Sequence, residues 1–376
     1  MAVSSKGKKK DNRRLFEVDS VKFLAIIFMV CVHVYEQFGK WDFYGDIPGS
    51  AYRNTLEFLG GPLAAPVFMF CMGVGMIYTR HSEPADFIRR GVKLLLTGYA
   101  LNFVRQTLPM LIGMMIGIKT DYSLIGGLLN VDILPFAGMT FITVGILKKI
   151  NAATPVICGI AVLMQAVGIW GTKLKIASVG VQTLLGLLLP SGQHVAFPLT
   201  LWLIYPAFGM LFGEWLKKTE DRDKLYRRMM LSAASFFAAY TAALLYIGYD
   251  IRMFYALYDL TYYHQTILST LWIMPLVILE LGACYFLLRK IEETKGGAFI
   301  RYCSINLNTI YIIQWILIAY TLAFSMLFGV EKTQSPLKLT ALGFLMLAAA
   351  IGIMTLIRKI ECMKQQRREN GKEKIG

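Results

Sequence analysis

The apolar stretch of residues 18–38, VDSVKFLAIIFMVCVHVYEQF, decides the fold. A helix of this length crosses the hydrocarbon core of a bilayer, which needs about 20 residues. Four polar residues interrupt it, namely Asp19, Lys22, His33 and Glu36. At about 100° per residue, these four positions fall on one face of the helix. An ionisable side chain inside a membrane segment usually faces a bundle interior or a watery cavity. We therefore predict that this face of the helix lines a functional path through the protein.

The composition excludes an ordinary soluble globular domain. The chain has 376 residues, of which 56% are hydrophobic and 17% charged, and its mean hydropathy is +0.53. These values predict an all-α polytopic membrane protein. A net charge of +15 could also indicate a nucleic-acid binder. However, most of the Lys and Arg residues fall on the side of the N-terminus when the spans are laid out, which is the positive-inside bias. We therefore expect the lipid bilayer as a partner and no nucleic acid.

The apolar runs predict a bundle of about ten transmembrane helices. They cover Val18–Phe38, Pro62–Thr79, Gly91 to beyond Arg105, Asp132–Leu147, Pro155–Trp170, Phe197–Trp215, Met229–Gly248, Ile267–Leu288, Ile305–Leu327 and Leu337–Leu356. Ten spans put both termini on the cytoplasmic side, as the charges require. The expected organisation is a basic cytoplasmic tail (1–17), a transmembrane domain (18–357) and a second basic tail (358–376). We expect a multi-pass protein of the cell membrane, the bacterial plasma membrane in particular.

Three local features refine this layout. Pro109 kinks or breaks the third span, so the apolar residues after it either continue the helix or form a separate interfacial piece. The apolar segment 177–190 is short for a span, and a re-entrant or interfacial helix suits its length. Gly73 and Gly75 in the second span permit close contact with a neighbouring helix.

Cysteines and histidines narrow the possible chemistry. The six cysteines form no CxxC pair, and the four histidines show no metal-ligand spacing, so neither a disulfide framework nor a metal site is expected. His33 is the only histidine inside a predicted span, which makes it the first candidate for a general base. His264 and His194, both in outer segments, rank second and third.

Five blocks carry a family resemblance, and their order fits the ten-span layout. They read RLFEVDSVKFLAIIFMVCVH from Arg14, PLAAPVFMFCMGVGMIYTR followed by FIRRGVKLLLTGY from Pro62, DILPFAGMTFITVGIL from Asp132, FPLTLWLIYPAFGMLFGEW from Phe197, and SINLNTIYIIQWILI from Ser304. The chain from Arg14 to about Ile318 resembles the membrane-bound acyltransferase superfamily. That superfamily includes the acyltransferase 3 proteins and the heparan-α-glucosaminide N-acetyltransferase-like proteins, and the blocks resemble the second branch more closely.

The first block matches the family's first helix only in part. Asp19 and His33 stand where the family has its Asp and its His. Lys22 stands where an Arg is usual, and Phe23 where a Gly is usual. Lysine keeps the positive charge but lacks the planar guanidinium group with which arginine forms two parallel hydrogen bonds. This departure from the family pattern weakens the expectation that the residue binds a phosphate or carboxylate.

The resemblance implies an integral-membrane acyltransferase that moves an acetyl or other acyl group from cytoplasmic acetyl-CoA to a hydroxyl or amine of a cell-envelope glycan or lipid-linked sugar. His33 would be the general base or a transient acyl carrier. Asp132 would orient His33 or bind the acceptor, and Gln314 would donate a hydrogen bond to the acyl oxygen. The CoA phosphates need an inner basic site, for which the candidates are Arg14, Lys22, Arg89, Arg90 and Lys93. Formation of a homodimer is a further possibility that the sequence leaves open.

Each of these residues also has a plainer interpretation. His33 would then be a polar tie between two helices, and Gln314 a helix–helix contact. Asp132 would be a solvated acid at the edge of a span, and Glu36 has the same ambiguity. The basic residues would be topology charges.

Two other functional classes remain at this stage. A proton-coupled transporter or flippase would use the polar face of the first span and Glu280, a carboxyl predicted to lie deep in the eighth span. A non-catalytic membrane scaffold would leave the aligned polar face without a purpose.

Overall fold

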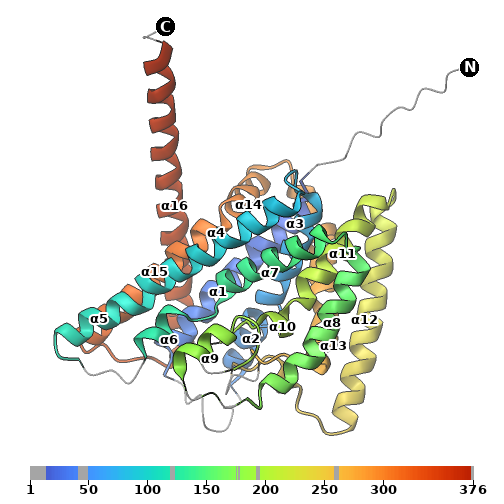
Figure 1. The fold of residues 1–376 in the computed structure, drawn as a ribbon, viewed down its shortest axis with the longest axis horizontal. Helices are drawn as coiled ribbons and strands as arrows, with labels where there is room; N and C mark the ends of the chain where they lie inside the picture. Colours follow the sequence, from blue (N-terminus) through green and yellow to red (C-terminus); the bar gives the residue numbers. More distant parts are fainter. Residues whose placement is uncertain are drawn as a thin grey trace, which may run out of the picture.

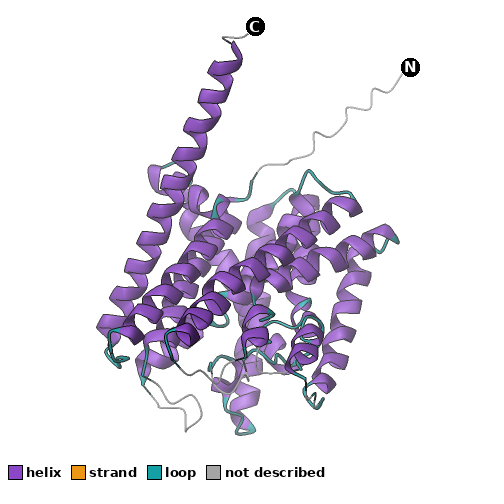
Figure 2. Ribbon diagram, turned by 60° about the vertical axis from the view of Figure 1, so that its left-hand side comes forward, coloured by secondary structure: helices purple, strands orange, loops and turns teal. Residues whose placement is uncertain are grey.

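A computed structural model of the chain consists of helices joined by loops (Figures 1 and 2). It describes residues 14–40, 50–118, 123–174, 176, 178–191, 195–257 and 262–373. The α-helices are α1 (Phe16–Phe38), α2 (Ala51–Gly60), α3 (Ala65–Tyr78), α4 (Pro84–Asn102), α5 (Leu108–Met115), α6 (Leu124–Leu128), α7 (Ile133–Lys149), α8 (Thr154–Gly171), α9 (Val179–Leu185), α10 (Leu199–Trp202), α11 (Ile204–Lys218), α12 (Arg222–Tyr246), α13 (Ile267–Leu288), α14 (Lys295–Ile305), α15 (Leu307–Leu327) and α16 (Pro336–Glu373). Shorter turns are η1 (Phe103–Thr107), η2 (Ile251–Phe254) and η3 (Arg289–Ile291). The predicted all-α class is confirmed.

Helix α1 lies in the middle of the bundle (Figure 1). It packs against α2, α3, α13, α14, α15 and α16. Val21, Ala25 and Val30 are fully buried in these contacts. The helix ends at Gly39, whose backbone N–H donates to the carbonyl of Tyr35 and whose extended conformation turns the chain away. The predicted polar face therefore lies inside the bundle, surrounded by other helices.

The structure places helices at all ten predicted spans, and eight of the described helical segments are long and apolar enough to cross a membrane. The other two predicted spans correspond to α4, which begins in a charged stretch, and α7, which has 17 residues. The number of membrane crossings therefore stays a prediction. The second span begins earlier than expected, at Ala51, because α2 and α3 follow one another almost without a break.

Helices α4 and α7 approach each other closely through glycines. A methyl group added at Gly138 would lie 2.8 Å from the carbonyl oxygen of Gly91, and one added at Gly98 would lie 2.6 Å from the ring of Pro135. Only glycine allows backbones to approach so closely. This pairing holds the start of α7, and with it Asp132, against the outer half of α4.

Pro109 does not break the third span. The helix widens into the π-turn η1 just before it, where the backbone N–H of Leu108 bonds to the carbonyl of Phe103, five residues back. A proline ring clashes with the carbonyl four residues before it in an α-helix, and the wider turn removes that clash. Residues after Pro109 continue the same helix as α5, which decides between the two alternatives left open by the sequence.

Glycines also join α3 to α11. A methyl group at Gly73 would lie 2.0 Å from the carbonyl oxygen of Pro206, whereas one at Gly75 would meet no atom within 4 Å. The prediction of close contact is therefore confirmed at Gly73 and wrong at Gly75, which lies on the opposite, exposed side of the helix.

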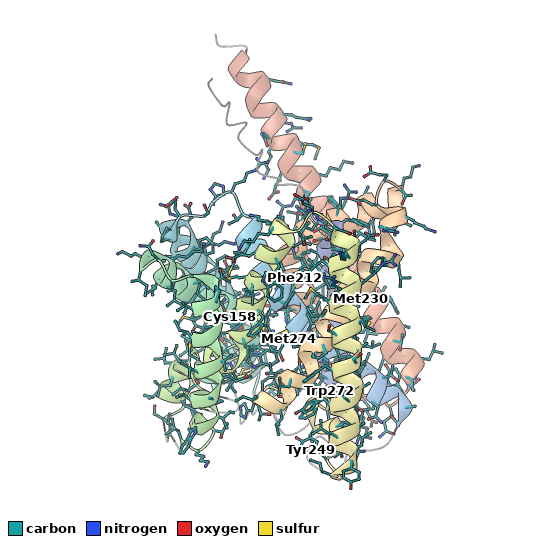
Figure 3. The ribbon with its side chains drawn as sticks, turned by 90° about the vertical axis from the view of Figure 1, so that its right-hand side faces the viewer. Cys158, Phe212, Met230, Tyr249, Trp272 and Met274 are labelled. Atoms are coloured by element: carbon teal, nitrogen blue, oxygen red, sulfur yellow. The ribbon has the colours of Figure 1, made fainter. Side chains whose placement is uncertain are left out.

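Helix α12 covers one edge of the bundle and packs against α13 (Figure 3). Met230 fills the space left by Gly282, and the indole N–H of Trp272 donates to Thr241 at 3.0 Å. On another side, residues 179–185 form the short helix α9, in keeping with a segment too short to span. Helix α16 continues without a break through residue 357 to Glu373 and projects from the bundle (Figures 1 and 2).

Candidate active site

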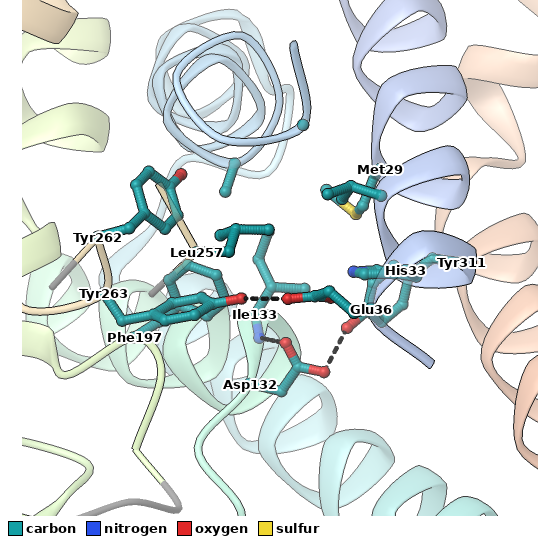
Figure 4. A pocket seen from close by; sticks show the side chains of 13 residues that line it. Met29, His33, Glu36, Asp132, Ile133, Phe197, Leu257, Tyr262, Tyr263 and Tyr311 are labelled. Atoms are coloured by element: carbon teal, nitrogen blue, oxygen red, sulfur yellow. Dashed lines mark hydrogen bonds between the residues drawn. The ribbon is translucent and has the colours of Figure 1, made fainter. Parts of the chain in front are cut away.

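A small cavity lies beside residues 29–36 of α1, on the predicted outer side, and Figure 4 shows the side chains that line it. Its volume is about 30 Å³, which has room for about two water molecules. The described residues around it belong to the outer half of α1, the ends of α2 and α3 that face each other, the start of α7 and α15, together with Phe197, Leu257, Tyr262 and Tyr263. The lining residues are Met29, Val32, His33, Glu36, Gly60, Ala65, Asp132, Ile133, Phe197, Leu257, Tyr262, Tyr263 and Tyr311.

His33 is held on two sides by α15. Its Nδ1 lies 3.3 Å from Oε1 of Gln314, a residue with no exposed surface. Its ring stacks on the indole of Trp315, with 4.0 Å between the ring centroids. The other edge of the imidazole faces the cavity (Figure 4). When Nδ1 carries the proton and donates it to Gln314, Nε2 keeps its lone pair toward the cavity, as a general base requires.

Asp132 reaches the same cavity but does not bond to His33. Its Oδ1 accepts from the backbone N–H of Ile133 at 2.7 Å and thereby caps α7. Its Oδ2 accepts from the hydroxyl of Tyr311 at 2.7 Å and pairs with Nη2 of Arg105 at 2.7 Å. The carboxylate is therefore held by three donors from three different elements, and it acts on His33 through the field in the cavity rather than through a hydrogen bond.

Arg105 is a site residue that the sequence reasoning missed. It lies in η1 with only 3% of its side chain exposed. Its guanidinium carbon sits 4.2 Å from the ring centroid of Trp315, and its Nη2 also donates to Asn102 at 3.1 Å. The available signal was an arginine in the middle of a predicted span, which is costly unless paired. Asp132 is that partner.

The opposite wall of the cavity is aromatic. The hydroxyl of Tyr263 donates to Oε1 of Glu36 at 3.2 Å, and burial beside Glu36 raises the pKa of Tyr263 well above its usual range, so the phenol keeps its proton. The backbone carbonyl of Tyr263 accepts from the indole of Trp202 at 2.8 Å, and its ring packs on Phe197. The second-choice base, His264, is not among the residues that line the cavity. His194 lies outside the described residues.

The predicted inner basic residues differ in how far their charges are already engaged by partners within the chain. Arg14 is bound to Asp19, with Nη2 2.7 Å from Oδ1 and Nε also in contact. Ser304 on α14 donates to the same carboxylate at 2.7 Å. This network fixes the start of α1, so the charge of Arg14 is already engaged.

The other inner candidates are less constrained. Lys22 is half-buried, and it interacts electrostatically with Arg14 and Arg90. Arg89, Arg90 and Lys93 are exposed on α4, where the guanidinium of Arg90 lies 4.5 Å over the ring of Phe141. Positive charge from α1 and α4 therefore meets at the inner end of the bundle. Eleven residues of α1 separate Lys22 from His33, a rise of about 16 Å.

The family model for the acyltransferase domain of the acyltransferase 3 type matches residues 15–355, which is most of the chain. The chain belongs to the acyltransferase 3 family. The resemblance named two branches of the superfamily, and the matching model is that of the acyltransferase 3 branch. No curated protein and no solved structure matches the chain. The protein is thus a membrane acyltransferase, and the matched region contains every residue of the cavity.

Proposed function

We propose that this acyltransferase 3 protein moves an acetyl group from acetyl-CoA, bound at the inner end of the bundle, to a hydroxyl or amine of a cell-envelope glycan or lipid-linked sugar at the outer end. The observation that carries the proposal is the hydrogen bond between His33 Nδ1 and Gln314, which leaves the other edge of the ring toward the cavity. A histidine that only joined two helices by a hydrogen bond would not require a cavity beside it. The carboxyl and phenol groups on the cavity wall therefore favour a chemical role for His33.

In the direct route, Nε2 of His33 removes the proton from the acceptor as its oxygen or nitrogen attacks the thioester carbonyl. A tetrahedral oxyanion forms, and its collapse breaks the carbon–sulfur bond. The leaving thiolate then takes the proton from the imidazolium. In the second route, Nε2 itself attacks the thioester and displaces the CoA thiolate, which leaves an acetyl-imidazolium. The acceptor then attacks the acetyl group and displaces the neutral imidazole, and the acceptor's proton goes to the thiolate. The neutral tautomer that donates its Nδ1 proton to Oε1 of Gln314 serves both routes.

The donor site belongs to the inner residues. Arg89, Arg90 and Lys93 are exposed and would meet the CoA phosphates, and Lys22 lies between them and the cavity along α1. We assign Arg14 to the structural clamp on Asp19 rather than to the donor. The thioester must then reach about 16 Å along α1 to His33, which the long pantetheine arm of CoA can do.

Binding and hydrolysis of acetyl-CoA by the purified protein in detergent test this proposal. His33→Ala should bind acetyl-CoA but lose thioester turnover, while His81→Ala, at an exposed inner histidine, should keep both. The double variant Arg89→Ala/Arg90→Ala should lose binding, while Arg227→Ala/Arg228→Ala, an exposed inner arginine pair on α12, should keep it. Normal turnover by His33→Ala would overturn the assignment of the base.

The transporter alternative has one observation in its favour. Both carboxyl oxygens of Glu280 on α13 are buried, and they have no hydrogen-bond partner in the described part of the chain. Such a group suits proton coupling. Uptake or scrambling of a sugar lipid in liposomes without any acyl-CoA, lost in Glu280→Gln, would support transport. The family match and the cavity at His33 favour acyl transfer.

A further inference from the structure

Glu36 lies one turn beyond His33 on the same face of α1, so both side chains reach the cavity. Its carboxyl points across the cavity toward Tyr263, opposite the wall that holds the imidazole (Figure 4). An acceptor positioned for attack beside His33 would therefore touch Glu36 as well. Glu36 therefore influences which chemical groups of an acceptor can bind next to His33.

The charges around the cavity are unequally compensated. Two carboxylates interact electrostatically with Glu36, namely Glu57 and Asp132. Each is bonded to a buried arginine, since Arg53 Nε lies 2.9 Å from Glu57 and Arg105 Nη2 lies 2.7 Å from Asp132. Glu36 forms no such ion pair with any described residue, and a phenol hydroxyl is its hydrogen-bond donor. It is the one carboxyl of the cavity wall that has no ion-pair partner among the described residues.

The wall beside Glu36 is aromatic, and its rings pack against one another. Tyr262 donates to the carbonyl of Gly61 at 2.9 Å and packs edge-on against Tyr263. Phe197 packs on Tyr263 from the other side. Aromatic faces bind the apolar face of a sugar ring, while a carboxylate accepts hydrogen bonds from its hydroxyl or ammonium groups. The residues that line the cavity include no Lys or Arg, so an anionic group at this place would lose its hydration beside the Glu36 carboxyl without gaining a cation, which is unfavourable.

We propose that Glu36 is the acceptor-selecting residue of this acyltransferase: it accepts a hydrogen bond from a hydroxyl or ammonium group next to the reacting atom and excludes acceptors that carry a negative charge there. This inference rests on the proposed function and names its substrate class. The acceptor is a neutral or amino sugar unit rather than a uronate or sugar phosphate.

Three soluble probes that differ in charge test it. Methyl glucoside is neutral, glucosamine is cationic, and methyl glucuronide carries a carboxylate where the glucoside carries a hydroxymethyl group. The measurement is kcat and KM for transfer of labelled acetyl from acetyl-CoA to each probe, with purified protein in detergent. For the wild type we expect kcat/KM with the glucuronide at least about tenfold below that with the glucoside, the size of one charged hydrogen bond.

The variant Glu36→Gln keeps the shape of the side chain and removes its charge. It should raise KM for glucoside and glucosamine about tenfold or more, and bring the glucuronide within about threefold of the glucoside. Tyr263→Phe, which releases Glu36 from its hydroxyl, should raise the same KM values by a smaller factor. Glu331→Gln, at an exposed acid between α15 and α16, should leave all three ratios unchanged. A purely structural role for Glu36 would lower activity without altering the order of the probes.

The outcomes separate this inference from the proposed function. A wild type that neither transfers nor hydrolyses acetyl-CoA contradicts the proposed function. A wild type that uses the glucuronide as well as the glucoside, or a Glu36→Gln variant with unchanged discrimination, contradicts the role of Glu36 alone. Hydrolysis of acetyl-CoA with no transfer to any probe would also overturn the assigned acceptor class while leaving the acyltransferase chemistry in place.

Discussion

Oε1 of Gln314 lies 3.3 Å from Nδ1 of His33, although 281 residues separate the two in the sequence. The contact joins the first helix of the bundle to one of the last. It does so at the atom that decides which imidazole nitrogen carries the proton. The tautomer of His33, and with it the direction of its lone pair, thus depends on the packing of α15 against α1.

Gln314→Leu should lower kcat for acetyl transfer about 10- to 100-fold while changing KM for acetyl-CoA little. The reason is that the imidazole loses the acceptor that keeps the proton on Nδ1, so fewer molecules hold a free lone pair toward the cavity. Steady-state kinetics in detergent provide the measurement. Asn308→Leu, at an exposed position of the same helix, is the matched control, and an equal loss in both variants would contradict the role of Gln314.

Arg105→Met should destabilise the folded protein by about 3 kcal/mol, because it leaves Asp132 buried without its cation. The double variant Arg105→Met/Asp132→Asn should recover much of the lost stability, since no unpaired charge remains. Thermal unfolding in detergent, followed by near-ultraviolet circular dichroism, measures both. If the double variant is as unstable as the sum of the two single variants, the two residues do not form an energetic pair.

Gly73→Ala should cost about 1–3 kcal/mol of stability, because the added methyl group would meet the carbonyl of Pro206 at 2.0 Å and force α3 away from α11. Gly75→Ala on the same helix should be neutral or stabilising by up to about 1 kcal/mol, since open space surrounds it and alanine favours the helix. The melting temperatures of the two variants, two residues apart, provide the comparison. Equal losses would mean that the helix backbone, and not the contact with α11, is sensitive.

Arg14→Ala should lower the melting temperature without weakening acetyl-CoA binding, because Arg14 is engaged by Asp19 and Ser304 at the start of α1. The Arg89→Ala/Arg90→Ala pair should show the reverse, with weaker binding that depends strongly on salt. Isothermal titration at two ionic strengths separates the two effects. Loss of binding in Arg14→Ala at full stability would return Arg14 to the donor site.

The sequence was sufficient to predict the helical bundle, and it singled out His33 as the histidine within a span; its role stays a prediction. Long apolar runs and the 3.6-residue period fix where helices form, and the polar face of α1 points to its interior position. The sequence could not predict what His33 contacts. That depends on how α15 packs against α1, and nothing local in residues 304–318 specifies the neighbour.

Arg105 illustrates the other limit. In the sequence it stands close to Pro109, and its place in the helix depends on whether that proline bends, breaks or widens the chain. Only the π-turn directs its guanidinium to Asp132 and Trp315.

Lys22 and the residues on α4 were predicted as one donor site from their charge alone. Their exposure leaves that prediction open, whereas the clamp on Asp19 sets Arg14 apart.

The π-turn also has a consequence for comparing this chain with its relatives. A π-turn holds one residue more than the α-helical turn it replaces. A relative with a regular helix in this place would therefore align correctly only with a one-residue gap inside residues 103–107. A gap placed elsewhere along the helix would shift the register by one position and match Arg105 to a neighbouring residue. The partner of Asp132 would then seem to be missing from proteins that contain it.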